Sequence, residues 1–315
     1  MKIFRDISEI PKYTNTVLTV GTFDGVHKGH QKIINEVVNT SKNEALRNLV
    51  ITFWPHPRKV LFKDSEIKLL TSQQEQKEIL SKLGVENLLV INFTKSFSEI
   101  TSYQFVKDFI LDKIGLKKII IGYDHHFGKA RQGNVNFLKS ISKDLNFDVV
   151  EIEPLKIDSN IVSSSLIRTE LLNGNINLAN KLLGREYSFT GTVVHGDGRG
   201  RELGYPTANI LLDEPDKLLP KLGIYAVYLF IDEKKYKGLL SVGRRPTFYN
   251  NGDIVPEVYI YDFNMDIYNK KIKVEILEKL RDEEKFNSAE ELINQMNIDK
   301  QNGLEIFNKL NQSNN

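Results

Sequence analysis

The stretch Val17-Leu18-Thr19-Val20-Gly21-Thr22-Phe23-Asp24-Gly25-Val26-His27-Lys28-Gly29-His30 determines the fold expected for the first half of the chain. Its first four residues predict a buried strand, and the glycines that follow predict a sharp turn into a helix. Backbone N–H groups at such a helix start can bind a phosphate. His27 and His30 are spaced to share one helix face, where two imidazoles can donate hydrogen bonds to phosphoryl oxygens. A glycine-rich turn with two surface histidines is the alternative interpretation.

Short apolar runs alternate with helical spacing through the rest of this half. We predict strands at 17–20, 49–53, 88–91, 118–121 and 147–150, with helices at 31–40, 73–83, 103–114 and 135–145. This alternation predicts βαβ units, and hence an α/β fold with a Rossmann-like, mostly parallel sheet between two layers of helices. Ligands of such sheets bind outside the carboxyl ends of the strands, so residues that follow a strand are candidate site residues.

The pattern changes near Gly184, after two helices predicted at 163–172 and 176–183. Short strands separated by turns with Gly or Pro are predicted beyond it, at 188–195, 208–212, 224–231, 236–242, 255–262 and 271–277. This spacing is typical of a small antiparallel β-barrel, here followed by terminal helices at 288–296 and 303–310. We therefore expect two domains, 1–184 and 185–315, which agrees with about 150 residues per domain.

The composition excludes several classes of protein. The 43 Lys and Arg residues against 41 Asp and Glu leave a net charge of +2, which disfavours a nucleic-acid binder and a polybasic membrane anchor. No apolar run approaches the roughly 20 residues of a membrane span, and Met1 to Asp6 lacks the apolar core of a signal peptide. Cysteine is absent, which excludes disulfides and thiolate chemistry. We expect a cytoplasmic protein whose partners are small molecules, with its oligomeric state left open.

Three further segments of the first half contain candidate site residues. Phe53-Trp54-Pro55-His56-Pro57 follows the second strand, and its prolines predict a rigid aromatic rim suited to a flat ring, with core packing as the alternative for Trp54. Asp124-His125-His126-Phe127 follows the fourth strand, and core packing is the alternative for its phenylalanine. Ser163-Ser164-Ser165-x-x-Arg168 combines hydroxyls at a helix start with an arginine one turn later. Such serines can bind phosphate or simply cap the helix.

The second half has its own candidates. The glycine-rich, basic segment 191–201 could fold over a polyphosphate, although a surface hairpin is an equal alternative. Thr207 and Asn209 are two residues apart on an extended segment, so their oxygens face one side and suit Mg²⁺, with turn hydrogen bonding as the alternative. Glu257 alternates with apolar neighbours on a predicted strand, where a solvent-facing carboxylate is the ordinary interpretation.

The motif His27-x-Gly29-His30, together with Ser163-Ser164-Ser165-x-x-Arg168, resembles the nucleotidylyltransferase superfamily. The longer strings 21–27, 55–57 and 162–168 resemble the FMN adenylyltransferase domain of bacterial bifunctional riboflavin kinase/FAD synthetases. The resemblance implies that the FMN phosphate attacks the α-phosphorus of ATP while His27 and His30 stabilise the developing charge. The implied ATP and phosphate contacts are Gly21, Phe23, Asp24, Gly29, Ser163, Ser164 and Arg168. The implied flavin contacts are Pro55, Pro57, Asp124 and Phe127. Position 125 is His where many members have an aromatic residue.

The segments 191–210, 220–227, 243–248 and 280–286 resemble the riboflavin kinase module, in family order. The resemblance implies that Thr207 and Asn209 coordinate Mg²⁺ and that Glu257 is the general base on the riboflavin 5′-hydroxyl. It also implies a flavin contact at Arg281 and ATP contacts at Gly196, Gly198, Arg199 and Gly200. Ser241-Val242 stands where the family often has Asn-Ile, which we interpret as a minor packing change.

Together the two resemblances predict a bifunctional enzyme of flavin-cofactor biosynthesis. Its barrel would phosphorylate riboflavin with ATP to FMN, and its α/β domain would adenylylate FMN to FAD, with Mg²⁺ as cofactor. One alternative keeps the adenylyltransferase but makes the barrel a non-catalytic flavin-binding or regulatory module. The presence of Thr207, Asn209 and Glu257 argues against this alternative. A second alternative, a nucleic-acid-binding barrel, is disfavoured by the near-neutral charge.

Overall fold

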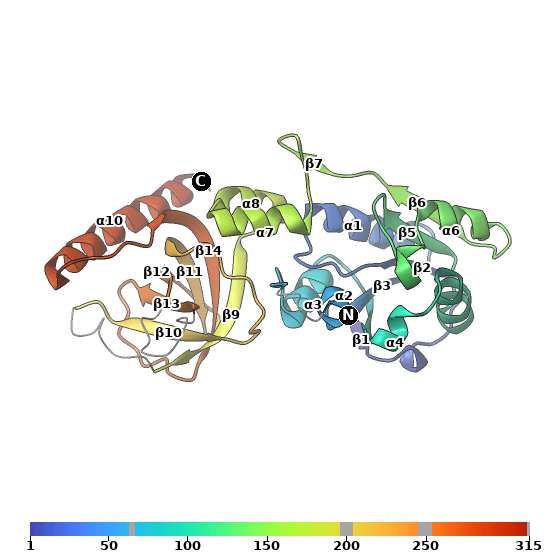
Figure 1. The fold of residues 1–315 in the computed structure, drawn as a ribbon, viewed down its shortest axis with the longest axis horizontal. Helices are drawn as coiled ribbons and strands as arrows, with labels where there is room; N and C mark the ends of the chain where they lie inside the picture. Colours follow the sequence, from blue (N-terminus) through green and yellow to red (C-terminus); the bar gives the residue numbers. More distant parts are fainter. Residues whose placement is uncertain (63–66, 196–203, 245–253, 314–315) are drawn as a thin grey trace. The chain divides into compact units, whose positions relative to one another are not determined.

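The computed structural model describes the chain except for residues 63–66, 196–203, 245–253 and 314–315 (Figure 1). The described residues form two compact units, Met1–Ser164 and Ser165–Asn315. The first contains a parallel sheet and the second a closed antiparallel barrel, which confirms the predicted fold class. The exact domain boundary predicted after Gly184 stays a prediction.

The first unit is built on a six-stranded sheet in the order β1-β4-β3-β2-β5-β6, in which every pair of neighbours is parallel. The strands are β1(Lys2–Phe4), β2(Thr16–Val20), β3(Arg47–Trp54), β4(Asn87–Asn92), β5(Lys118–Gly122) and β6(Asp148–Ile152). The last five confirm the predicted strands. β1 was not predicted, because three residues at a sheet edge are too short to show a period of two.

Helices cover both faces of this sheet. The longer ones are α1(Lys28–Asn43), α3(Gln73–Lys82), the π-helix η2(Phe105–Ile114), which continues α5(Ser102–Gln104), and α6(Val135–Ser142). Short elements complete the unit: η1(Ile7–Glu9), α2(Pro57–Leu61), α4(Lys95–Ser98), η3(Lys129–Arg131), β7(Lys156–Ile157) and β8(Asn160–Ile161). The sequence predicted the four longer helical segments but none of these short elements.

Successive side chains of each strand point to opposite faces of the sheet, which explains why a layer of helices covers each face. In β3, Leu49 and Ile51 pack in one core with η2 and α6, whereas Val50 packs in a second core with α1 and α3. β2, β4 and β5 alternate in the same way. Burying an aliphatic side chain of this size stabilises the fold by about 1.5–3 kcal/mol. A strand that is apolar on both faces is therefore stable only between two helix layers.

The second unit is a barrel of six strands, closed in the order β10-β13-β12-β11-β14-β9. The strands are β9(Tyr187–Val194), β10(Thr207–Leu212), β11(Gly223–Ile231), β12(Lys234–Arg244), β13(Ile254–Ile260) and β14(Lys271–Asp282). Inward-facing side chains such as Phe189, Val227, Leu240, Val258 and Val274 are fully buried. The alternate residues face outward, and this outer surface carries the candidate kinase residues.

Among the described residues of this unit, three helices accompany the barrel: α7(Ser164–Asn173), α8(Ile176–Leu183) and α10(Ala289–Ser313). The side chain of Asn180 in α8 donates to the carbonyl of Ile276 at 2.9 Å and accepts from the N–H of Tyr187 at 2.7 Å. Within this unit these bonds fix α8 against β9 and β14.

The prediction of two separate terminal helices was wrong, because α10 is one continuous helix. Gly303, the first residue of the second predicted helix, lies inside it, where a glycine costs about 1 kcal/mol relative to alanine. A Cβ at this position would come within 2.5 Å of the Tyr261 hydroxyl, so the missing side chain lets the helix approach the barrel. Ile306 and Phe307 are then buried against Leu239. This packing outweighs the low helix propensity of glycine.

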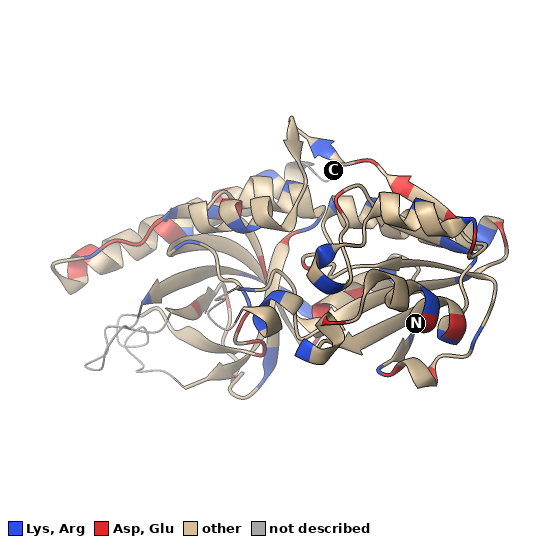
Figure 2. Ribbon diagram, turned by 45° about the vertical axis from the view of Figure 1, so that its right-hand side comes forward, with Lys and Arg blue, Asp and Glu red and all other residues tan. Residues whose placement is uncertain are grey.

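Charges of both signs are interspersed along both units, as the near-neutral composition predicts (Figure 2). Within the part of the chain that the structure describes, no helix is both long enough and apolar enough to cross a membrane.

Candidate active sites

The sheet order places the first candidate site. β2 lies between β3 and β5 in the sheet. From β2 the chain continues to β3 and β4 on one side, and it then crosses back to form β5 and β6 on the other side of β2. The carboxyl ends of β2 and β5 therefore flank the point where the strand order reverses, which is where open α/β sheets bind ligands. The segments that follow these two strands are 21–30 and 123–133, the same segments that the sequence selected.

The turn after β2 is tightly constrained. Phe23, Gly25 and Val26 have positive φ angles of 47°, 83° and 35°. Only the glycine adopts this region without strain, so the two others must be held by their surroundings. Both are buried, and the side-chain amide of Gln76 in α3 donates to the carbonyl of Thr22 at 2.8 Å. The turn is thus a preformed part of the core rather than an open surface loop.

The paired histidines lie at the start of α1, as predicted. His27 is the N-cap, and its Nδ1 accepts from the backbone N–H of His30 at 3.2 Å. Because Nδ1 accepts, the neutral ring carries its proton on Nε2, which is then a donor. The two rings stack with centroids 3.6 Å apart, so both imidazoles lie together at a helix N-terminus. A Cβ on Gly29 would approach His27 Nδ1 to 3.1 Å, which explains the glycine between them.

The serine segment reaches the same turn. Ser164 begins α7, and its hydroxyl donates to the backbone carbonyl of Asp24 at 2.9 Å. Ser163 directly precedes it. Arg168 lies one turn farther along the same helix, among residues of the second compact unit. The structure therefore brings the histidines, Asp24 and the two serines together, and the phosphate contact of Arg168 stays a prediction.

The proline segment lies at the carboxyl end of β3. Pro57 is the first residue of α2, whose N-cap His56 accepts from the N–H of Arg58 at 3.2 Å. A small hollow of about 250 Å³ adjoins this segment. Its lining comes from three neighbouring stretches of the unit: Thr22, Asp24, Phe53, Trp54, His56, Leu69, Thr71, Ser72 and Gln76. Most of this lining is polar, with Phe53, Trp54 and Leu69 as its apolar members, and the flavin contacts of Pro55 and Pro57 stay predictions.

The segment after β5 is partly core. Phe127 is 8% exposed and packs against Phe105 and Phe137, so the packing alternative accounts for its burial. Asp124 is exposed, and the ring of His125 stacks on Phe127 with centroids 5.7 Å apart. Burial, reinforced by the charges of His126 and Arg131, lowers the pKa of His125 to about 4. His125 is therefore neutral at pH 7 and occupies its position as an uncharged aromatic ring.

The second candidate site lies on the outer face of the barrel. Asn209 of β10, Glu257 of β13, Ser241 of β12, Ile224 of β11 and Arg281 of β14 are successive cross-strand partners. Directly paired residues on one sheet face have Cβ atoms about 4.5–5.5 Å apart. The amide of Asn209 and the hydroxyl of Ser241 therefore flank the Glu257 carboxylate on both sides.

Thr207 completes this arrangement. Its Oγ1 lies 3.4 Å from Glu257 Oε2, close enough for a long hydrogen bond, and it faces the same side of β10 as Asn209. The structure thus gathers the three residues that the sequence predicted for the kinase site. The register also places Ser241, one of the two residues that differ from the family pattern, next to the carboxylate. Sequence reasoning could not find this proximity, because it depends on the pairing of β12 with β13.

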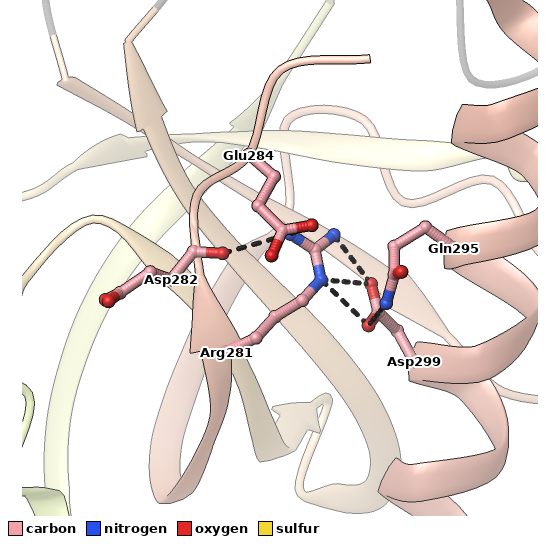
Figure 3. A network of polar contacts seen from close by, with 5 residues as sticks. All are labelled: Arg281, Asp282, Glu284, Gln295 and Asp299. Atoms are coloured by element: carbon pink, nitrogen blue, oxygen red, sulfur yellow. Dashed lines mark hydrogen bonds and ion pairs between the residues drawn. The ribbon is translucent and has the colours of Figure 1, made fainter.

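Arg281 makes extensive contacts within the protein (Figure 3). Its Nε and Nη2 bind the carboxylate of Asp299 in α10 at 2.8–3.1 Å, and Nη1 donates to the carbonyl of Asp282 at 3.0 Å. Asp299 is 3% exposed and also accepts from Gln295 at 3.0 Å. This bidentate pair fixes α10 to β14, and the flavin contact predicted for Arg281 stays a prediction. Within this network, Gln295 and Asp299 are four residues apart on one face of α10.

Four predicted ATP contacts, Gly196, Gly198, Arg199 and Gly200, lie outside the described residues. Among the residues that are described, no cluster of three or more His, Asp or Glu side chains could hold a metal ion. The hydroxyl and amide oxygens of Thr207 and Asn209 are a different kind of donor set, one that suits a cation bound mainly through substrate phosphates and water.

The α/β unit, with paired histidines at its switch point, and the barrel, with its Thr-Asn-Glu face, together define a two-domain protein of nucleotide and phosphate chemistry. Residues 9–166 match the FAD synthetase family, and residues 183–307 match the riboflavin kinase family. A bifunctional riboflavin kinase/FMN adenylyltransferase of Buchnera aphidicola is 38% identical over 95% of this chain and 96% of its own. Proteins of the same description from Bacillus subtilis and Escherichia coli K12 are 37% and 32% identical. These alignments cover 94% of this chain and 93% of the Bacillus subtilis protein, and 98% of both chains for Escherichia coli.

A solved structure from Streptococcus pneumoniae, described as a macrolide-efflux protein, has a TM-score of 0.87 at 31% identity, over 95% of this chain and 97% of its own. The chain belongs to the bifunctional riboflavin kinase/FMN adenylyltransferase family.

Proposed function

We propose that the chain converts riboflavin to FMN in its barrel unit and FMN to FAD in its α/β unit, with ATP as co-substrate of both steps. The observation that carries this function is the order of the two sites along the chain. The switch-point histidines lie within the stretch that matches FAD synthetases, and the Thr207–Glu257 face lies within the stretch that matches riboflavin kinases.

In the adenylyl transfer, a phosphate oxygen of FMN attacks the α-phosphorus of ATP, and the bond from that phosphorus to pyrophosphate breaks. No protein atom needs to become covalently attached, so positioning and charge stabilisation can supply most of the rate. His27 and His30 would donate to the phosphoryl oxygens from a helix N-terminus, whose dipole also favours negative charge. Gly21 and Phe23 in the turn and Gly29 at the start of α1 would contact ATP, while Ser163, Ser164 and Arg168 would hold the leaving pyrophosphate.

In the kinase step, the 5′-hydroxyl oxygen of riboflavin attacks the γ-phosphorus of ATP, and ADP leaves. The hydroxyl proton must be accepted as the new bond forms, and Glu257, whose carboxylate lies on this face, would accept it. Thr207 beside Glu257 and Asn209 paired with it fit a hard divalent cation, so these two residues would hold Mg²⁺. When bound, Mg²⁺ would neutralise charge on the transferred phosphate.

The flavin contacts are also proposals. In the α/β unit, Trp54 and His56, the chain neighbours of Pro55 and Pro57, line the hollow, and Asp124 and Phe127 follow β5 at the same sheet edge. In the barrel, Arg281 lies in the same cross-strand row as Glu257, so it could reach a substrate on this face once the substrate is bound.

The most direct experiment incubates the purified protein with riboflavin, ATP and Mg²⁺ and separates the flavins over time. FMN that appears first and is then converted to FAD supports both activities. Formation of FAD from supplied FMN, but no FMN from riboflavin, would instead support a non-catalytic barrel. A parallel sample with EDTA tests the proposed Mg²⁺ requirement.

A further inference from the structure

Asp24 is a buried carboxylate that binds a distant stretch of the first unit. It is 4% exposed, and its Oδ1 accepts from the N–H groups of Leu70 and Thr71 at 2.9 and 3.1 Å. Its Oδ2 lies 3.2 Å from the same Leu70 nitrogen. Charge-assisted hydrogen bonds of this kind are about twice as strong as neutral ones. The carboxylate therefore anchors the stretch before α3 to the turn after β2.

Two further hydrogen bonds close this cluster. The hydroxyl of Thr71 accepts from the N–H of Gly25 at 3.0 Å. The backbone carbonyl of Asp24 accepts from the Ser164 hydroxyl at 2.9 Å. Three segments that are 46 and 140 residues apart in sequence thus meet at one residue.

The cluster supports a strained stretch of backbone. Asp24 lies between Phe23 and Gly25, and both neighbours, like Val26, have positive φ. A non-glycine residue in this region costs on the order of 1–3 kcal/mol and persists only where the surroundings fix it. The strained turn ends at His27, whose ring caps α1 and stacks on His30. The conformation of this turn therefore determines how the His27 and His30 side chains are oriented in the site.

We propose that Asp24 is a positioning residue, which holds the His27 and His30 side chains in the orientation that adenylyl transfer requires. It does so through its hydrogen bonds to Leu70, Thr71 and Ser164, and it does not itself bind the nucleotide. This inference rests on the proposed FMN adenylyltransferase activity. It replaces the sequence-based expectation of a phosphate contact, because an ionised carboxylate has no hydrogen to donate to a phosphate and would repel it.

The two roles predict opposite results for Asp24→Asn. Asparagine keeps an Oδ1 that can accept from both N–H groups but removes the charge. If Asp24 only positions the turn, Asp24→Asn keeps most of the kcat for FAD formation from FMN. Asp24→Ala removes both bonds, and a shift of the histidines by about 1 Å can lower the rate about 100-fold. The KM for ATP should change little in either variant, because the contacts of ATP are not removed.

Riboflavin phosphorylation by the same polypeptide serves as the internal control, since it uses the barrel and should be unchanged in both variants. Thr71→Val removes the hydroxyl that accepts from Gly25 and donates to Asp24 Oδ1 at 3.4 Å, and it is a milder variant for the case that Asp24→Ala does not fold. It should lower kcat for FAD formation by a smaller factor, again at nearly constant KM for ATP.

A readout that does not depend on activity completes the test. The imidazole ¹H–¹⁵N NMR signals of His27 and His30 should shift in Asp24→Ala and stay near their wild-type positions in Asp24→Asn. The proposal is overturned if Asp24→Asn is as inactive as Asp24→Ala with a raised KM for ATP, or if Asp24→Ala leaves both kcat and the histidine signals unchanged. A wild-type protein that forms no FAD would instead overturn the proposed function, and the NMR comparison would still decide the positioning role.

Discussion

The substitution Glu257→Gln should separate the chemistry of the kinase step from the stability of the barrel. Glutamine has almost the same size and keeps an oxygen near Thr207, but it cannot accept the proton of the riboflavin hydroxyl. A positioned general base contributes about 10²–10⁴-fold in rate. At 1.36 kcal/mol for each factor of ten, this is a loss of about 2.7–5.4 kcal/mol of transition-state stabilisation.

The expected loss of folding stability is much smaller. The hydrogen bond from Thr207 Oγ1 to Glu257 Oε2 is 3.4 Å long, beyond the usual range for O–H···O bonds. Even a typical hydrogen bond contributes only about 1 kcal/mol, and Glu257 is partly exposed, so water can solvate the amide that replaces it. Glu257→Gln should therefore cost much more transition-state stabilisation than free energy of unfolding.

The assay measures both flavin reactions on the same preparation. FMN formation from riboflavin should fall about 100-fold or more, while FAD formation from supplied FMN and the melting temperature stay at wild-type values. Glu275→Gln is a matched control, because Glu275 is another outward-facing barrel carboxylate, paired with Lys273 at 2.8 Å. Near-normal FMN formation by Glu257→Gln would refute the general-base assignment. An equal loss of both activities together with a lower melting temperature would show that Glu257 is structural.

Three further predictions concern the other site residues. His27→Ala should lower kcat for FAD formation by about 10²–10³-fold, because it removes a donor aimed at developing charge, and should leave FMN formation unchanged; unchanged FAD synthesis would remove His27 from the mechanism. Thr207→Val should raise the Mg²⁺ concentration needed for half-maximal FMN formation several-fold by removing one hydroxyl ligand, and an unchanged metal titration would exclude this ligand. The pKa of His125 is about 4 in the folded protein, against about 6.5 in the unfolded chain. As the pH falls, the unfolded chain therefore binds a proton at this residue before the folded protein does, and the free energy of unfolding of the wild type should decrease between about pH 6.5 and about pH 4. His125→Phe should lose this component of the pH dependence in urea unfolding, and equal pH profiles for both proteins would contradict the assigned pKa.

Most of the fold was predictable because it depends on local patterns. Val50 and its neighbours Leu49 and Ile51 are apolar on both strand faces, and only a sheet between two helix layers can bury both sets. The features that sequence reasoning missed are of two kinds. β1 is too short to show a period, and the continuity of α10 through Gly303 depends on contacts with Tyr261 and Leu239 that lie far away in sequence.

The same distinction applies to the two sites. His27 with His30, and Thr207 with Asn209, are pairs whose spacing alone places both members on one face of a helix or a strand. Their surroundings could not be predicted in this way. The partners of Asp24 are 46 and 140 residues distant, and Asp299 is 18 residues from Arg281, so the spacing of these residues does not reveal their contacts.

This difference affects how departures from a family pattern should be interpreted. For Ser241, the sequence alone favours a minor packing change. The strand register instead places it on the outer face directly opposite Glu257, whereas its neighbour Val242 is fully buried. A hydroxyl beside the proposed general base can affect the orientation of that base or of the substrate alcohol, while Val242 affects only the filling of the barrel. The two substitutions are adjacent in sequence, yet they belong to different parts of the molecule, because successive residues of a strand point to opposite faces.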